Sequence, residues 1–355
     1  MRAILFTGLL AAATLGIGWG CAFSPAQHAP RPGDPRSPEA ACRVGYTTST
    51  YLFRLMLDHC GEERVNIVAI GDSWFSFADG NLLFSLRLAM EHSRARPVSN
   101  LLNLARPGND ANTAVSGVIK RDFADVLRYR DYEIRFLLIS GGGNDVLGRN
   151  DLDRLLRNAV PSANPSAPET YFDQPTLDRK LEGIRMAYEE ILDMRETWAP
   201  EAIVVTHTYA RVKPSGRPAR LEIASFDVEV DGPWIAPFLE ERGILDERIQ
   251  QEVMDYLLDR VNGTIRNTVS SHRGGRAPIV IVDTRNASPP LEPGNTEHWQ
   301  DEIHPTPFGF DILGQQFIRC MQRVSPDFLR DFRPAYGDPR LCLEIRPDAL
   351  PNPGG

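Results

Sequence analysis

The chain has 355 residues, a formal net charge of −8, 42% hydrophobic residues and 24% charged residues. This is the composition of an ordinary globular protein that is long enough to bury a large core. The acidic balance and the lack of a Lys/Arg-rich stripe argue against a nucleic-acid partner. No C-x-x-C or H-E-x-x-H spacing occurs, so we predict no metal site and no cofactor.

Residues 1–21 have the pattern of an export signal. Arg2 is a short positive region, residues 3–20 are predominantly apolar, and Cys21 follows Gly20. Gly20-Cys21 resembles a bacterial lipoprotein cleavage site, at which an acylated Cys21 would tether the protein to a membrane. Ordinary cleavage at this small-residue site also fits, and the run is just long enough for an uncleaved anchor. We predict export, to a periplasmic, extracellular or lipoprotein location, and leave the processing route open.

The cysteine count agrees with export. If Cys21 is lipidated or removed, Cys42, Cys60, Cys320 and Cys342 remain, and four cysteines allow three disulfide connectivities. The local pairs Cys42–Cys60 and Cys320–Cys342 close the shortest loops, and four reduced buried thiols are the alternative.

Proline-rich segments flank the expected folded body. Residues 22–40 are predicted to form a flexible linker, because they are rich in Pro, Ala, Ser and Arg. The folded domain is expected over residues 41–332. A proline-punctuated C-terminal tail is expected over residues 333–355.

Short apolar runs alternate with helical patterns through the predicted domain. Strands are predicted at 65–70, 99–105, 135–140, 202–206 and 278–283. Helices are predicted near 81–93, 110–129, 176–197 and 245–270, with another after Pro305. Most strand candidates are continuously apolar, which is typical of parallel strands covered on both faces. The alternation predicts an α/β fold with one doubly wound, mainly parallel, five-stranded sheet.

Residues 209–244 interrupt this alternation with several prolines and glycines. A long irregular segment after the carboxyl end of a strand often forms a binding loop or lid. A surface excursion packed for stability alone is an equally good interpretation of this insertion.

A serine lies at the carboxyl end of the first predicted strand, in the sequence Gly71-Asp72-Ser73. Open α/β sheets place their active sites at this edge, so Ser73 is a candidate nucleophile if a base can reach it. Asp301 precedes His304 by three residues near the other end of the chain. This pair supplies a candidate base and a carboxylate to orient it.

Two further strand ends carry candidate oxyanion donors. Gly108 follows the second predicted strand, where a backbone N–H can point outward and a side chain would obstruct it. Asn144 follows a run of three glycines after the third predicted strand. Its side-chain amide can donate to a developing oxyanion.

Taken together, these blocks resemble the SGNH hydrolase family, also called GDSL esterases and lipases. Gly-Asp-Ser, an isolated glycine after strand two, Gly-x-Asn-Asp and Asp-x-x-His-Pro occur in the family's order over about residues 65–320. Trp74 departs from the leucine that is common after the nucleophile. The resemblance implies a three-layer α/β/α, flavodoxin-like architecture.

The resemblance also implies a role for each matching residue. Ser73 would attack an ester carbonyl, His304 would act as base, and Asp301 would orient His304. The oxyanion hole would consist of the backbone N–H groups of Ser73 and Gly108 and the side chain of Asn144.

Other polar residues near these motifs have plainer interpretations. Asp72 is expected to form hydrogen bonds at the strand end, and Asp145 to cap the helix that follows it. We expect His207 to be an ordinary buried histidine and His298 to be an exposed loop residue. Glu302 fits the orienting geometry for His304 less well than Asp301 does.

The predicted function is that of an exported serine esterase acting on carboxylic esters of small molecules, lipids or carbohydrates. One alternative is an O-acetyltransferase or deacetylase acting on cell-envelope or extracellular carbohydrate with the same residues. A second alternative is an envelope binding protein that keeps the fold without turnover.

Overall fold

The computed structural model describes residues 45–347, apart from short gaps at 60–63, 78–79, 94–97, 130–132, 149–150, 160–166, 224–225 and 273. A seven-stranded sheet runs through this part of the chain in the order β1-β3-β2-β4-β5-β8-β9. Its strands are β1 (Tyr46–Thr47), β2 (Arg64–Ile70), β3 (Val98–Asn103), β4 (Ile134–Ile139), β5 (Ile203–His207), β8 (Ile279–Val282) and β9 (Cys342–Ile345). Only β9 is antiparallel to its neighbour.

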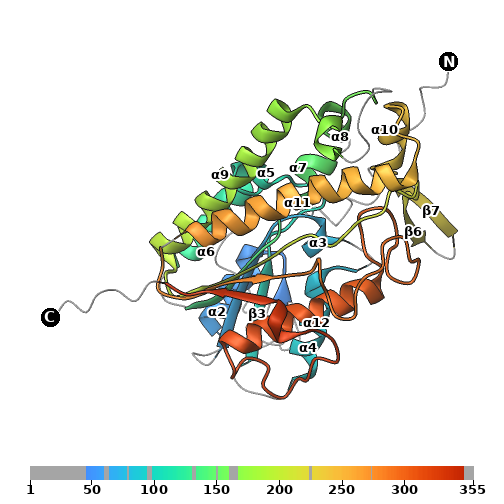
Figure 1. The fold of residues 1–355 in the computed structure, drawn as a ribbon. Helices are drawn as coiled ribbons and strands as arrows, with labels where there is room; N and C mark the ends of the chain where they lie inside the picture. The colour runs from blue at the N-terminus through green and yellow to red at the C-terminus, as the bar shows by residue number, and fades with distance from the viewer. Residues whose placement is uncertain are drawn as a thin grey trace, which may run out of the picture.

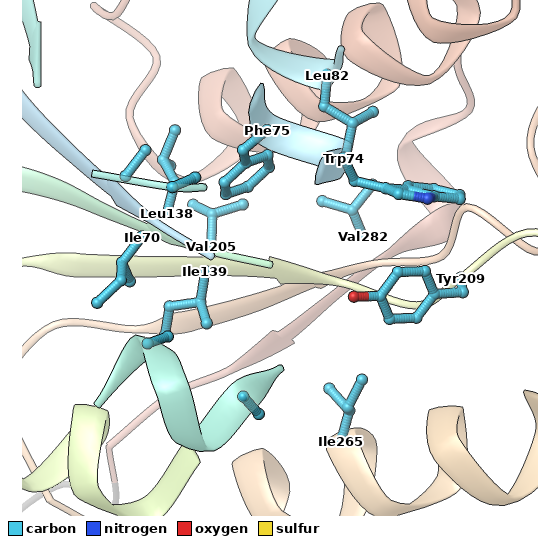
Figure 2. Close-up of a cluster of buried hydrophobic side chains, with 14 of the residues drawn as sticks. Ile70, Trp74, Phe75, Leu82, Leu138, Ile139, Val205, Tyr209, Ile265 and Val282 are labelled. Carbon is cyan, nitrogen blue, oxygen red and sulfur yellow. The ribbon is translucent and has the colours of Figure 1, made fainter. Parts of the chain in front are cut away.

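The five predicted strands are β2, β3, β4, β5 and β8, and each lies within a few residues of its expected position. Numbered in chain order, these five strands have the spatial order 2-1-3-4-5, which is the flavodoxin-like doubly wound arrangement. Their apolar runs are buried on both faces, and Figure 2 shows Ile70, Leu138, Ile139 and Val205 packed in the core. The predicted α/β class is therefore confirmed.

Helices cover both faces of the sheet (Figure 1). One face carries α2 (Thr50–His59), α4 (Leu82–His92) and α12 (Pro307–Val324). The other carries α5 (Ala111–Ala114), α6 (Gly117–Leu127), α9 (Gln174–Trp198) and α11 (Glu247–Ser271). The predicted three-layer arrangement is therefore present. Within the described residues, no helix is both long enough and apolar enough to cross a bilayer.

The short helices lie mostly at or near the carboxyl edge of the sheet. They are α3 (Ser73–Ser76), α7 (Gly143–Leu147), α8 (Asp151–Leu155), α10 (Ala236–Glu241) and the 3-10 turns η1 (Pro168–Tyr171) and η2 (Pro339–Leu341). Two of them, α3 and α7, begin directly after β2 and β4. They therefore present their first residues at the point where the strand order reverses, the usual position of an α/β active site.

The sheet has two strands more than the five that we predicted. The added strands are the two-residue β1 and the four-residue β9 at the opposite edges. β9 lies within 333–355, which we expected to be a tail beyond the domain, and it pairs with β8. An edge strand this short, with only its first residue buried, carries little hydrophobic pattern. Its place depends on the neighbouring strand.

A disulfide links Cys320 in α12 to Cys342 at the start of β9. This confirms one of the two local pairings and fixes the C-terminal segment to the domain. Cys21, Cys42 and Cys60 lie outside the described residues, as do the predicted export signal and the linker at 22–40.

The insertion at 209–244 is more regular than predicted. It contains an antiparallel hairpin of β6 (Ala219–Ile223) and β7 (Phe226–Asp231), followed by α10. The many prolines and glycines obscure these elements in the sequence, because they lie at the ends of the elements and in the connections between them.

Candidate active site

Ser73 is the first residue of α3, and two residues separate it from the end of β2. Asp72 caps this helix, and its Oδ1 accepts a hydrogen bond from the backbone N–H of Trp74 at 3.0 Å. Gly71 has a φ of +149°, and a Cβ at this position would lie 2.0 Å from the carbonyl oxygen of Ser140. The turn therefore requires glycine, because it brings the ends of β2 and β4 into close contact.

Asp301 and His304 lie in the loop before α12 and reach Ser73 across 231 residues of sequence. The Nε2 of His304 lies 2.9 Å from the Oγ of Ser73, and its Nδ1 lies 2.9 Å from the Oδ2 of Asp301. The Oδ1 of Asp301 accepts the backbone N–H groups of Ile303 and His304 at 2.8 and 2.7 Å. The carboxylate thus fixes both the backbone and the ring of His304.

The environment of His304 restricts the orientation of its ring. Phe77 stacks on it with ring centroids 4.0 Å apart, and Trp234 meets it edge-on at 5.4 Å. A carboxylate only accepts hydrogen bonds, so the Nδ1 of His304 carries a hydrogen and its neutral ring presents a lone pair at Nε2. This tautomer can accept the proton of Ser73.

Asn144 lies in the first turn of α7, beside Ser73. Ser73 and Asn144 line the same pocket, and the Nδ2 of Asn144 donates to the carbonyl oxygen of Asn109 at 2.8 Å. Gly108 precedes Asn109 and has a φ of +76°, which favours glycine although a Cβ would meet nothing within 4 Å. The loop after β3 is thus joined to Asn144, and the oxyanion role of Gly108 stays a prediction.

A network of buried hydrogen bonds supports the turn that carries Ser73. The Oγ of Ser140, at the end of β4, donates to the Oδ1 of Asp72 at 2.6 Å. The hydroxyl of Tyr209 donates to the Oδ2 of Asp72. Asp72 is therefore a hydrogen-bonding residue at the strand end, as predicted, and its partners come from the ends of two other strands.

His207 lies beneath this network, at the end of β5. Its Nε2 is 2.9 Å from the Oγ of Ser140, and the indole of Trp74 stacks on its ring. Burial lowers the pKa of His207 below its usual value, against a smaller opposing effect of the Thr208 carbonyl. It is a buried histidine, as predicted, and its ring packs against the indole of Trp74.

Asp145 does not cap the helix that follows it. α7 begins at Gly143, so Asp145 lies inside its first turn, and its Oδ2 accepts the backbone N–H of Ala111 at 2.8 Å. The side chain therefore joins α7 to the start of α5. Burial raises the pKa of Asp145 to about 7, although the hydrogen bond from Ala111 opposes the shift.

Glu302 has a role that its sequence position does not reveal. Its carboxylate is buried and accepts four backbone N–H groups of the 209–244 insertion, at distances of 2.6–3.0 Å. The donors are Ser215, Gly216, Ile235 and Ala236. Glu302 therefore anchors the insertion near His304, whose ring contacts Asp301 instead. Because the partners lie 66–87 residues away, no local pattern marks this residue.

Two further residues complete the account of the predicted polar groups. His298 is partly exposed, and its Nδ1 accepts the backbone N–H of Glu292 at 3.2 Å. Away from the site, Asp193, Glu196 and His272 form a small group at the surface of the described chain. Two of the three are exposed, and the Nε2 of the third, His272, lies 3.6 Å from the Oε2 of Glu196.

No family model and no curated protein matches this chain. Among solved structures, a lipase from a goat rumen metagenome is 13% identical, with a TM-score of 0.41, covering 71% of this chain and 94% of its own. An extracellular lipase from Streptomyces rimosus is 16% identical (TM-score 0.39; 69% and 94%). A carbohydrate esterase of family 3 from Talaromyces cellulolyticus is 14% identical (TM-score 0.39; 76% and 100%). Because the sequence identities and TM-scores are this low, the function is argued from the residues and distances of the site.

Proposed function

We propose that this protein is a serine esterase of the SGNH hydrolase type, which hydrolyses carboxylic esters. The observation that carries this proposal is the unbroken chain of contacts from Asp301 through His304 to Ser73, with both distances at 2.9 Å. All three side chains are at most 6% exposed, so bulk water does not compete for these hydrogen bonds. A nucleophile, a base and a group that orients the base are the parts that acyl transfer requires.

The reaction proceeds in two halves. The Oγ of Ser73 attacks the ester carbonyl carbon while its proton passes to the Nε2 of His304. The bond to the alcohol oxygen then breaks, and the proton on His304 moves to that oxygen. In the second half, water attacks the acyl-enzyme and gives a proton to His304. The Ser73–acyl bond then breaks, Ser73 recovers its proton, and a carboxylic acid is released.

The negative charge that forms on the carbonyl oxygen needs donors. The amide of Asn144 and the backbone N–H groups of Ser73 and Gly108 supply them. Support for Asn144 comes from its position beside Ser73 and from its fixed orientation through Asn109. A donor that is already oriented stabilises the developing charge without a reorganisation cost during the reaction.

Acyl transfer to a carbohydrate hydroxyl is the second candidate function, because it uses the same nucleophile, base and oxyanion donors. In that reaction a sugar hydroxyl replaces water in the second half. The intact triad disfavours the remaining alternative, an envelope binding protein without turnover. We further propose, from the sequence of residues 1–21, that the protein is exported and acts in the periplasm, outside the cell or as a lipoprotein tethered through Cys21.

The test of the function is covalent labelling with a fluorophosphonate probe, together with hydrolysis of p-nitrophenyl acetate. We expect the wild-type protein to be labelled and active, and Ser73→Ala to be neither. Ser76→Ala is a matched control in the same short helix and should keep both properties. Labelling of Ser73→Ala at the wild-type level would reject the nucleophile. Release of acylated sugar when a carbohydrate acceptor is added would favour the transferase.

A further inference from the structure

The pocket beside the nucleophile has one polar side and a wall of apolar side chains. Asp72, Ser73 and Asn144 lie on the polar side. The carboxylate of Asp72 already accepts hydrogen bonds from Ser140 and Tyr209. The apolar residues come from α3, α7, α11, the 209–244 insertion and the loop before α12 that holds His304. They are Trp74, Leu147, Tyr209, Val212, Leu258 and Ile303. All six are at most 8% exposed. A pocket of this kind suits a small alkyl group better than a hydrated sugar or alcohol.

The positions of the catalytic groups decide which part of an ester enters this pocket. The leaving alcohol oxygen receives its proton from His304, so the alcohol must depart on the side of that ring. His304 is not among the residues that line the pocket. The carbonyl oxygen points to Asn144, so the remaining substituent of the carbonyl carbon, the acyl chain, faces the pocket.

The size of the pocket limits the length of that chain. The cavity volume open to the centre of a water-sized sphere is only about 20 Å³, so the pocket holds more than one water molecule but has no room for a long alkyl chain. We propose that this pocket is the acyl-binding site and that it selects esters of short acyl chains, an inference that rests on the proposed esterase function.

Two walls of the pocket are held in place by contacts on their far sides. The hydroxyl of Tyr209 is bound to Asp72, and its ring lies so close to Gly143 that a Cβ there would be 3.1 Å away. The indole of Trp74 donates to the carbonyl oxygen of Ile303 at 3.3 Å and stacks on His207. These rings cannot move aside without losing buried contacts, so a longer acyl chain meets a fixed wall.

The test is a series of p-nitrophenyl esters with acetyl, butyryl and octanoyl chains, which share one leaving group. We expect kcat/KM for the acetyl and butyryl esters to exceed that for the octanoyl ester by on the order of 10- to 100-fold, since poorly accommodated methylenes have effects of this size. Leu258→Ala should shift the preference towards octanoate by lengthening the pocket. Leu257→Ala is the matched control, because Leu257 is the adjacent buried leucine of α11 and does not line the pocket.

Val212→Ala enlarges the pocket from the insertion and gives a second, independent test should Leu258→Ala fail to fold. A wild-type preference for octanoate, or equal rates along the series, would overturn the short-acyl assignment while leaving the esterase function intact. An unchanged preference in both folded pocket variants would overturn it too. If the wild-type protein showed neither ester turnover nor fluorophosphonate labelling, the esterase function would be rejected, and this inference with it.

Discussion

The Oγ of Ser140 donates a hydrogen bond to the Oδ1 of Asp72 at 2.6 Å, which joins the end of β4 to the turn that carries the nucleophile. The same oxygen lies 2.9 Å from the Nε2 of His207 at the end of β5. Three adjacent strands are thus connected beneath Ser73. The position of the nucleophile depends on this buried connection as well as on the helix cap.

We expect Ser140→Ala to lower kcat by about 5- to 10-fold with little change in KM, because a hydrogen bond contributes about 1 kcal/mol and its loss loosens the turn. Steady-state kinetics check this. Ser85→Ala is the control, since Ser85 is a buried serine outside the site. Its hydroxyl donates to Asp311 at 2.8 Å. If both variants lost stability and neither lost kcat, the Ser140 contact would be structural only.

Asp301→Asn should leave the fold intact and reduce kcat by up to about 10,000-fold, by analogy with other triads. The amide oxygen can still accept the two backbone N–H groups, but its NH₂ group would face the Nδ1 of His304. It would then stabilise the tautomer that presents N–H to Ser73. Single-turnover kinetics measure the effect on the chemical step, and a thermal melt measures any effect on stability.

Glu302→Gln is the matched comparison, because it neutralises the neighbouring acid. Its carboxylate holds four backbone N–H groups of the insertion. We therefore expect a loss of about 1–3 kcal/mol in stability, faster proteolysis within 209–244 and a kcat within about tenfold of wild type. A drop in kcat as large as that of Asp301→Asn would show that Glu302 also orients the base.

Asn144→Ala should lower kcat by about 100- to 1000-fold, the usual effect of removing one oxyanion donor. KM should change less, because the interaction strengthens only as charge develops in the transition state. Comparison of kcat and KM with p-nitrophenyl acetate is the measurement. A normal kcat with a raised KM would instead make Asn144 a substrate-binding residue.

Asp145 makes a specific contribution to the pH dependence of stability. Its pKa is raised from 3.8 to about 7 in the folded protein, with burial as the main cause. Between these values the folded state holds a proton that the unfolded state has released, so the contribution of Asp145 to stability is full below about pH 4 and is lost as the pH rises through about 7. The shift corresponds to an upper limit of about 4 kcal/mol.

Asp145→Asn cannot ionise and should therefore remove this loss. We expect the difference in Tm between Asp145→Asn and wild type to move in favour of the variant from pH 5 to pH 8. Asp125→Asn, at an exposed site in α6, provides the control for simple removal of a charge. A Tm difference that does not vary with pH would contradict the raised pKa.

The sequence alone predicts the elements on which the site is built. Continuous apolar runs identify the five central strands, because strands covered on both faces must be apolar at nearly every position. Gly71 and Gly142 mark strand ends where only glycine suits the backbone. Ser73, Asn144 and His304 are recognisable because each lies in a short motif directly after a strand or before a helix.

Tertiary structure alone decides which strand ends and loops come together. The strand order brings Ser140, His207 and Tyr209 together under Asp72, directs Glu302 to the insertion and closes the small pocket beside Ser73. It also places β9 at the sheet edge. The hydrogen bonds that these side chains make under Asp72 and with the insertion join residues from 66 to 137 positions apart. Local periodicity reports whether a residue is buried, whereas its partner depends on how the whole chain packs.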